Sequence, residues 1–132
     1  MNFNEHNIQR GEIYQVSLGK TADGQELNRP VLVIQNDVGN RLYDSTIVVP
    51  LSPKVQAKRL FVSVIAPADH TTGLKEEHVA LFFQIRTLSK EKFNYENYLG
   101  KVDNSTIWKV DEAIKLSLGL STLQWIDNRK KA

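Results

Sequence analysis

The first two-thirds of the chain alternates short apolar runs with turn-forming clusters. Val, Ile, Leu and Phe are concentrated in five segments that we interpret as β-strands, at residues 12–18, 31–35, 46–51, 60–65 and 78–85. The breaks between them contain Gly, Asn, Asp and Pro, the residues that turns require, and the longest break spans residues 19–28. Short strands at this regular spacing are typical of a small antiparallel barrel.

The last third changes to a helical period. Apolar side chains recur at three- and four-residue steps between residues 104 and 118, at Ile107, Val110, Ile114 and Leu118. Asp103 or Asn104 can cap the start, and Gly119 stands where a left-handed C-terminal residue is wanted. The pattern predicts an amphipathic helix that packs on the barrel.

Shorter elements complete the prediction. A helical turn is expected near residues 89–93, a strand at 98–102 and a short final helix at 120–126. No internal repeat or Pro/Ser-rich linker divides the sequence, so residues 1–132 are predicted to form a single domain. Residues 1–8 and 127–132 are expected to be flexible ends.

Composition narrows the class of protein. With 41% hydrophobic and 24% charged residues, the chain has the balance of an ordinary soluble globular protein. It contains no cysteine, which excludes disulfides and cysteine-bearing zinc sites and suits a reducing cytoplasm. No segment has the apolar run of a secretory signal or of a membrane span. A net charge of +2 favours nucleic acid only weakly.

Metal and cofactor motifs are also absent from the sequence. The three histidines, His6, His70 and His78, lack metal-ligand spacing such as His-Glu-x-x-His, and we interpret each as incidental. The glycines are isolated, so no phosphate-binding or dinucleotide fingerprint appears. We therefore expect no metal and no cofactor.

Four segments carry a resemblance to a known family. In order, they are Gln9-Arg10-Gly11-Glu12-Ile13-Tyr14, Arg29-Pro30-Val31-Leu32-Val33-Ile34-Gln35-Asn36-Asp37, Gln84-Ile85-Arg86-Thr87 and Val110-Asp111-Glu112-Ala113-Ile114-Lys115-Leu116-Ser117-Leu118-Gly119-Leu120. None is decisive alone, but their combination resembles the MazF/PemK toxin family from about residue 8 to residue 120.

The resemblance implies a fold and an activity. The fold would be an SH3-like antiparallel β-barrel with added short helices and a C-terminal amphipathic helix. The protein would be a homodimeric toxin of a type II toxin–antitoxin system that cleaves single-stranded mRNA without a metal, leaving a 2′,3′-cyclic phosphate and a 5′-hydroxyl. Its partners would be RNA, an antitoxin of the MazE/PemI type and, for the toxin–antitoxin complex, operator DNA.

Arg29 is the leading catalytic candidate. Metal-free RNA cleavage needs a cation that stabilises the phosphorane charge, and a guanidinium can donate two hydrogen bonds to phosphate oxygens. Arg29 stands where the predicted 19–28 loop meets a strand, with Pro30 stiffening the junction. The residues alone favour an exposed arginine at a strand edge, whereas the match to the family's Arg-Pro motif implies the catalytic arginine.

Two polar residues are further candidates. Ser52 follows the predicted 46–51 strand, where the resemblance implies a catalytic hydroxyl that orients the phosphate or passes on a proton; alternatively, it forms a turn beside Pro53. Gln84 heads the Gln-Ile-Arg-Thr segment and either holds a base edge or a phosphate, or is a satisfied polar group near the barrel wall.

The sequence departs from the family at two places. Phe83 occupies the position of an acidic residue, so no carboxylate base is carried over; its ring either stacks on an unpaired base or, as we favour, lies in the barrel core. The loop before Arg29 also differs, and Asn28 and Glu26 are retained there as candidate substrate contacts. Trp108 and Trp125 are assigned to helix packing or to the dimer interface.

Two rival functions stay open. The first is a CcdB-like poison of DNA gyrase, which would share the barrel without being an enzyme. The second is a catalytically silent member of the same family that binds an antitoxin only, because Phe83 replaced the acid.

Overall fold

The computed structural model describes residues 6–54 and 64–121 of the chain. Along the chain, the described elements are β1 (Glu12–Lys20), β2 (Glu26–Val33), α1 (Asp37–Leu42), β3 (Ser45–Pro53), β4 (Ile65–Ala66), β5 (His78–Ala80), the 3₁₀ turn η2 (Phe82–Gln84), β6 (Arg86–Ser89), the 3₁₀ turn η3 (Lys90–Lys92), β7 (Tyr98–Lys101) and α2 (Asn104–Ser117).

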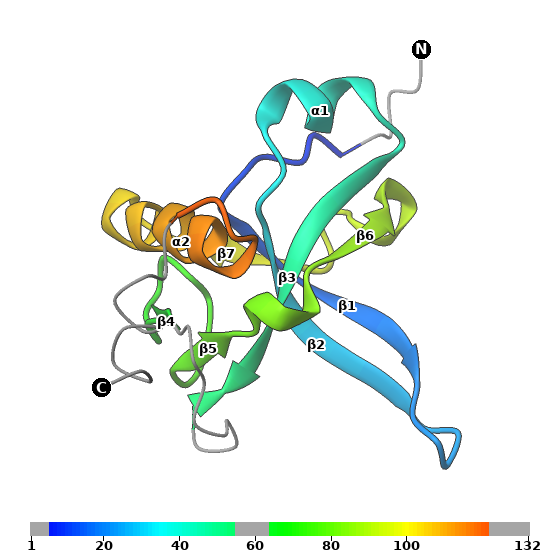
Figure 1. Ribbon diagram of the computed structural model, residues 1–132. Helices are drawn as coiled ribbons and strands as arrows, with labels where there is room; N and C mark the ends of the chain where they lie inside the picture. The colour runs from blue at the N-terminus through cyan, green and yellow to red at the C-terminus, as the bar shows by residue number, and fades with distance from the viewer. Residues whose placement is uncertain (1–5, 55–63, 122–132) are drawn as a thin grey trace.

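The strands form one curled antiparallel sheet. Their order is β4-β5-β3-β2-β1-β7, and β6 pairs with the first half of β3. The β1–β2 hairpin extends away from the rest of the molecule, and α2 lies across one side of the sheet (Figure 1). The predicted antiparallel barrel with a C-terminal amphipathic helix is confirmed as a curled half-barrel of this kind.

Side chains on the two faces of the sheet form two hydrophobic clusters. Because successive residues of a strand point to opposite faces, Leu32 joins the cluster beneath α2, while Val31 joins the other. Val110 from α2 completes the first cluster. The second includes Ile8, which is only 1% exposed although the sequence placed residues 1–8 in a flexible end.

Two prolines lie where β2 and β3 part. The last recorded pair between these strands is Val31 with Pro50, and β3 then pairs with β5. Neither Pro30 nor Pro50 has a backbone N–H to continue the ladder. The Pro50 carbonyl instead accepts a hydrogen bond of 2.9 Å from the Leu81 amide. Beyond this point β2 remains with β1, and β3 turns towards β5 (Figure 1).

The predicted loop at residues 19–28 is wrong. Only residues 21–25 lie between the two strands, and the turn is closed by a 2.7 Å hydrogen bond from the Thr21 amide to the Gln25 carbonyl. The Thr21 hydroxyl and the Gln25 amide donate to the Asp23 carboxylate and lower its pKa. The sequence missed this part of the hairpin because its side chains are mostly exposed, and alternation of apolar and polar residues fades there.

The predicted strand at residues 78–85 is also wrong as a single element. It divides into β5, η2 and the segment that leads into β6. The turn begins at Leu81, whose carbonyl accepts a 2.9 Å hydrogen bond from the Gln84 amide. β5 pairs with the second half of β3, and after the interruption β6 pairs with its first half. A continuous run of apolar residues in the sequence does not reveal this change in pairing.

The predicted break at residues 36–40 contains a short helix, α1. The Asn36 side chain caps it by accepting a 2.8 Å hydrogen bond from the Gly39 amide. Asn followed by Asp is a pattern that starts helices. The helix was not predicted because it has only six residues and contains Gly39, which has a low helix propensity.

Other predictions are confirmed. The helix expected at residues 104–118 is α2, and the Asp103 carboxylate caps it by accepting from the Thr106 amide at 2.8 Å. Gly119 follows with a φ of +76°, the left-handed conformation expected of it. The turn near 89–93 and the strand near 98–102 correspond to η3 and β7.

Some predictions fall on residues that the structure does not describe. Most of the predicted strand at 60–65 lies outside the described residues, and β4 covers Ile65–Ala66. Most of the helix at 120–126, including Trp125, and the end segment 127–132 also lie outside them. Within residues 6–54 and 64–121, no helix has both the length and the apolar character that a membrane span requires.

Candidate functional site

Arg29 lies inside β2 instead of at a loop junction. It pairs with Val16 of β1 and is half-buried. Across residues 6–54 and 64–121, no side chain or carbonyl forms a recorded hydrogen bond or ion pair with its guanidinium. Among the described residues, the charge of Arg29 therefore has no recorded neutralising partner.

Ser52 lies near the end of β3 and is 7% exposed. It pairs with Val79 of β5 beyond the point where β2 and β3 part. The recorded β2–β3 register ends at the pair Val31 and Pro50; Arg29 stands two residues before Val31, and Ser52 stands two residues after Pro50. Since cross-strand partners point to the same side of a sheet, both candidates belong to the face that carries Val31.

We call this side of the sheet, defined by Arg29, Val31, Val48 and Ser52, the arginine face. A second cation belongs to it, because Arg86 of β6 pairs with Val48 across β3. The Arg86 side chain is exposed and, within the described part of the chain, has no recorded partner. Sequence reasoning quoted Arg86 within a motif but gave it no role, and only the strand register reveals its side of the sheet.

Phe83 and Gln84 lie together in η2. Phe82 is buried in the cluster beneath α2, whereas Phe83 is 70% exposed, so our interpretation of Phe83 as a core residue is wrong. Successive residues of a 3₁₀ turn point about 120° apart, which directs only one of three side chains into the core. Gln84 is exposed as well. Leu81, just before the turn, is bonded to Pro50, which is two residues from Ser52.

Glu26 and Asn28 are exposed residues of the projecting part of β2. Strand alternation directs Asn28 to the face opposite Arg29. Neither residue has a recorded contact with Arg29, so the structure brings neither of them to it. In residues 6–54 and 64–121, no group of three or more His, Cys, Asp or Glu side chains is arranged to hold a metal ion.

The Gln35-Asn36-Asp37 part of the second motif has a structural role. Buried Asn40 accepts hydrogen bonds from the Thr46 hydroxyl at 2.6 Å and the Gln35 amide at 3.1 Å. Asp37 accepts from the Arg10 backbone amide at 2.7 Å, which ties the N-terminal segment to α1. These side chains hold the turn between β2 and β3 rather than a substrate.

A groove of about 760 Å³ lies between α2 and the sheet. Apolar residues that follow β2 and α1, or that lie in β3, between η2 and β6 and along α2 to its C-cap, line it together with paired charges and two amides. We call it the apolar groove and define it by Ile34, Tyr43, Ile47, Ile85, Trp108, Ile114 and Leu118, with Arg10, Gln35, Asn36, Asp111, Glu112 and Lys115. Trp108 is 65% exposed, so most of its side chain is not packed against the rest of the chain. None of the predicted catalytic residues lines this groove.

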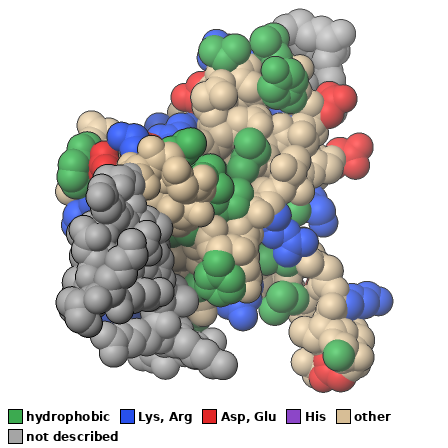
Figure 2. Space-filling model, viewed as in Figure 1, with side chains coloured by type: hydrophobic (Ala, Val, Ile, Leu, Met, Phe, Trp, Pro, Cys, Tyr) green, Lys and Arg blue, Asp and Glu red, His purple; other side chains and the backbone are tan. Residues whose placement is uncertain are grey.

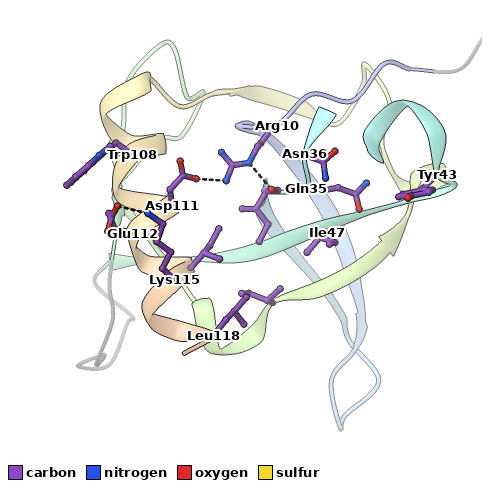
Figure 3. A pocket seen from close by; sticks show the side chains of 13 residues that line it. Arg10, Gln35, Asn36, Tyr43, Ile47, Trp108, Asp111, Glu112, Lys115 and Leu118 are labelled. Carbon is purple, nitrogen blue, oxygen red and sulfur yellow. Dashed lines mark hydrogen bonds and ion pairs between the residues drawn. The ribbon is translucent and has the colours of Figure 1, made fainter. Parts of the chain in front are cut away.

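The charged groups of the apolar groove neutralise one another. Arg10 Nη2 lies 2.6 Å from Asp111 Oδ1, and its Nε donates to the Ile34 carbonyl at 2.8 Å (Figure 3). Lys115 pairs with Glu112 at 3.2 Å. Hydrophobic side chains also gather over α1 and down the face between α1 and α2 (Figure 2). This surface suits an apolar partner better than a polyanion.

A curled antiparallel half-barrel with one C-terminal helix is the architecture of solved MazF toxins. In a Deinococcus radiodurans MazE–MazF crystal structure the matching chain is 20% identical, with a TM-score of 0.68 over 88% of this chain and 100% of that chain, a likeness of fold. An endoribonuclease from mycobacterial species, solved with its cognate antitoxin, is 26% identical, with a TM-score of 0.65 over 89% of this chain and 98% of that chain.

Sequence comparison agrees with the fold. The model of the PemK-like, MazF-like toxins of type II toxin–antitoxin systems matches residues 9–118. Endoribonuclease EndoA of Bacillus subtilis (strain 168) is 34% identical over 114 residues, which cover 86% of this chain and 96% of EndoA. The chain belongs to the PemK-like, MazF-like toxin family.

Proposed function

We propose that this toxin is an endoribonuclease that cleaves single-stranded mRNA in the cytoplasm. The observation that carries the proposal is the guanidinium of Arg29, which has no recorded partner among the described residues and, by strand alternation, belongs to the same side of the sheet as Ser52. The relative EndoA, named an endoribonuclease, supports the same activity.

The chemistry needs no group beyond the nucleic acid and the protein. The ribose 2′-hydroxyl releases its proton as its oxygen attacks the adjacent phosphorus, the bond from phosphorus to the 5′-oxygen breaks, and the departing 5′-oxygen takes up a proton. The products are a 2′,3′-cyclic phosphate and a 5′-hydroxyl. Arg29 stabilises the negative charge that develops on the phosphorane oxygens, because its fork can donate two hydrogen bonds. The Ser52 hydroxyl holds the phosphate in line for the attack.

Surrounding residues hold the rest of the strand. Arg86 contributes a phosphate contact on the arginine face, and Gln84 and the exposed Phe83 ring contact bases, by hydrogen bonding and by stacking. Asn28 and Glu26, on the projecting hairpin, contact nucleotides further from the cut. Phosphate contacts set the position of the strand, and base contacts select the site of cleavage.

The active form is a homodimer that associates through the apolar groove. Tyr43, Ile47, Trp108 and Leu118 are exposed large hydrophobic residues that line it together. Its cations are already paired with acids of the same chain, so a second apolar surface is a better occupant than RNA. A twofold axis would pair this surface with its own copy.

An antitoxin of the MazE/PemI type neutralises the toxin. A mycobacterial relative was solved with its cognate antitoxin, as was a Deinococcus radiodurans MazF. We propose that an acidic antitoxin segment, disordered when free, occupies the arginine face and excludes RNA. The toxin–antitoxin complex then binds operator DNA.

The test incubates the purified protein with a long single-stranded RNA in the presence of EDTA and maps the ends of the products. We expect cuts at one short preferred sequence, each with a 2′,3′-cyclic phosphate on the upstream fragment. Intact RNA after long incubation would contradict the activity and favour a silent toxin. Trapped DNA breaks in a gyrase assay, with RNA intact, would favour a gyrase poison.

A further inference from the structure

The side of the sheet that carries Arg29 continues to the outer strands β1 and β7. Arg29 pairs with Val16 of β1, which belongs to the same buried cluster as Tyr14, two residues earlier. Tyr14 in turn pairs with Tyr98 of β7, and their rings meet edge to face with centroids 5.4 Å apart. Tyr98 is therefore on the same side of the sheet as Arg29, two strands away, with roughly 12 Å between the two backbones.

A further cation approaches this side of the sheet from η3. Phe93, the residue after η3, packs into the same buried cluster as Val16. The exposed Lys92 precedes it, and its Nζ donates to the Ser17 carbonyl of β1 at 3.3 Å. Because Ser17 follows Val16, this ammonium group is fixed one strand and one residue from Arg29. Among the described residues, Lys92 has no recorded acidic partner.

Tyr95 presents an exposed ring beyond Lys92. Its side chain is 79% exposed, and the His6 ring braces it edge to face, with centroids 4.2 Å apart. His6 is itself held, because its Nε2 is hydrogen-bonded to the Tyr14 hydroxyl. The Tyr98 ring, also exposed, lies beside His6 as well. We call the group of His6, Tyr95 and Tyr98 the tyrosine platform.

The loop that carries Tyr95 is fixed by hydrogen bonds of its own side chains. The Asn94 side chain accepts from the Glu96 amide at 2.9 Å, and the Asn97 side chain accepts from the Asn94 amide at 2.8 Å. Asn97 also donates to the Lys92 carbonyl, and its own carbonyl accepts from β1 at 2.8 Å. An aromatic ring that is held open to solvent on such a loop loses little conformational entropy when a flat partner stacks on it.

The charges around the tyrosine platform favour a base there and a phosphate at Lys92. Glu96 follows Tyr95 and is exposed, so a phosphate at the platform would meet a carboxylate. Glu91 is an exposed neighbour of Lys92, but among the described residues neither acid forms a recorded ion pair with that lysine. Single-stranded RNA offers both groups at each nucleotide, a phosphate for a cation and an unpaired base whose flat face stacks on an aromatic ring.

We propose that the tyrosine platform stacks one unpaired base of the RNA strand that is cut at Arg29 and Ser52, and that Lys92 binds a phosphate between that base and the scissile bond. This inference rests on the proposed function and extends its binding site past the cut sequence. The platform contacts no reacting atom, so it contributes to substrate affinity and not to the chemical step. Since every base has a π-face, it adds no preference to the cut sequence.

The test measures kcat and KM on two single-stranded RNAs, one trimmed to the mapped cut sequence and one extended on both sides. Wild type is compared with Tyr95→Ser and Tyr95→Phe. On the extended RNA we expect Tyr95→Ser to raise KM about tenfold, a typical value for one stacked base, with kcat retained. Tyr95→Phe keeps the ring and is expected to match wild type. On the trimmed RNA all three proteins are expected to have the same KM.

Lys92→Ala is tested against Lys109→Ala. Lys109 is the matched control because it is an exposed lysine of α2, on the other side of the sheet. On a single strand each phosphate contact contributes about 0.7 to the slope of log KM against log salt concentration. On the extended RNA we expect Lys92→Ala to lower the slope by about this amount and Lys109→Ala to leave it unchanged. Equal slopes in the two variants would remove Lys92 from the path of the strand.

The outcomes separate this inference from the activity itself. If wild type cuts RNA and Tyr95→Ser keeps the wild-type KM on the extended RNA, or loses as much on the trimmed RNA, the platform is overturned while the activity stands. An unchanged KM would favour a protein partner for the exposed ring. If wild type cuts nothing, the proposed function fails, and fluorescence anisotropy with a labelled single-stranded RNA of mixed sequence decides: about tenfold weaker binding by Tyr95→Ser supports the platform, and equal affinities overturn it.

Discussion

The arginine face and the apolar groove lie on opposite faces of one sheet and differ in the state of their charges. In the groove, Arg10 and Lys115 are each held by an acid of the same chain. On the arginine face, Arg29 and Arg86 have no such partner among residues 6–54 and 64–121. A polyanion binds more favourably to cations that are not already neutralised. An apolar partner is better accommodated where the cations are paired with acids of the same chain, because no unpaired charge is then buried.

The proposed site does not lie in the cavity between α2 and the sheet. That groove, at about 760 Å³, is lined by none of the predicted catalytic residues. Arg29 and Ser52 instead belong to β2 and β3 near the place where the two strands part. We therefore propose that the charged region carries the chemistry and that the apolar groove serves assembly.

The largest effect is expected for Arg29→Ala. Loss of the guanidinium removes the stabilisation of the phosphorane charge, and we expect RNA cutting to fall about 100- to 1000-fold, as for the loss of one transition-state donor. The half-buried side chain forms no recorded bond with a described residue, so the melting temperature should change little. Single-turnover cleavage of a labelled RNA and thermal unfolding measure the two quantities.

Arg41→Ala is the matched control, because Arg41 is an exposed arginine of α1. It should cut RNA at the wild-type rate. Equal rates for Arg29→Ala and wild type would remove Arg29 from the active site, and equal losses in both variants would show a general charge effect.

The sequence named Arg29 as a candidate through the Arg-Pro motif and Ser52 through its place after the 46–51 strand, and both stay predictions. It could not place Arg29 within its strand, because the projecting hairpin has exposed side chains and weak alternation. Nor could it show that both residues share one face, since this follows from the register between β2 and β3, a pairing of residues far apart in the chain. The helix α2 was predictable because its period and caps are local.

Exposure was the property least predictable from residue type. Phe83 and Trp108 are large aromatic residues that favour a core, yet both are exposed. Phe83 is excluded from the core by the 3₁₀ turn that buries its neighbour Phe82.

The next effect tests the groove. Leu118→Asp places a charge on an exposed apolar residue of the groove, and we expect the dimer dissociation constant to rise about 100-fold, the effect of losing one interface hot spot. Sedimentation equilibrium measures it. Tyr95→Ser is the control, since Tyr95 is more exposed than Leu118 but does not line the groove. A Leu118→Asp protein that dimerises as wild type does would exclude the groove as the interface.

The smallest effect concerns the packing of β7, where Gly100 lies close to the loop that carries Thr71 and Thr72. A Cβ at Gly100 would lie 2.2 Å from the Thr71 carbonyl oxygen, so Gly100→Ala must shift backbone and should reduce the free energy of unfolding by about 2–3 kcal/mol. Gly24→Ala, in the hairpin turn, meets no atom within 4 Å but has a φ of +85°, and should cost about 1 kcal/mol. Urea unfolding measures both. If the Gly100 variant were as stable as the Gly24 variant, the loop that carries Thr71 would move aside at little cost; a clearly larger loss would show that the close packing of β7 against this loop resists such a shift.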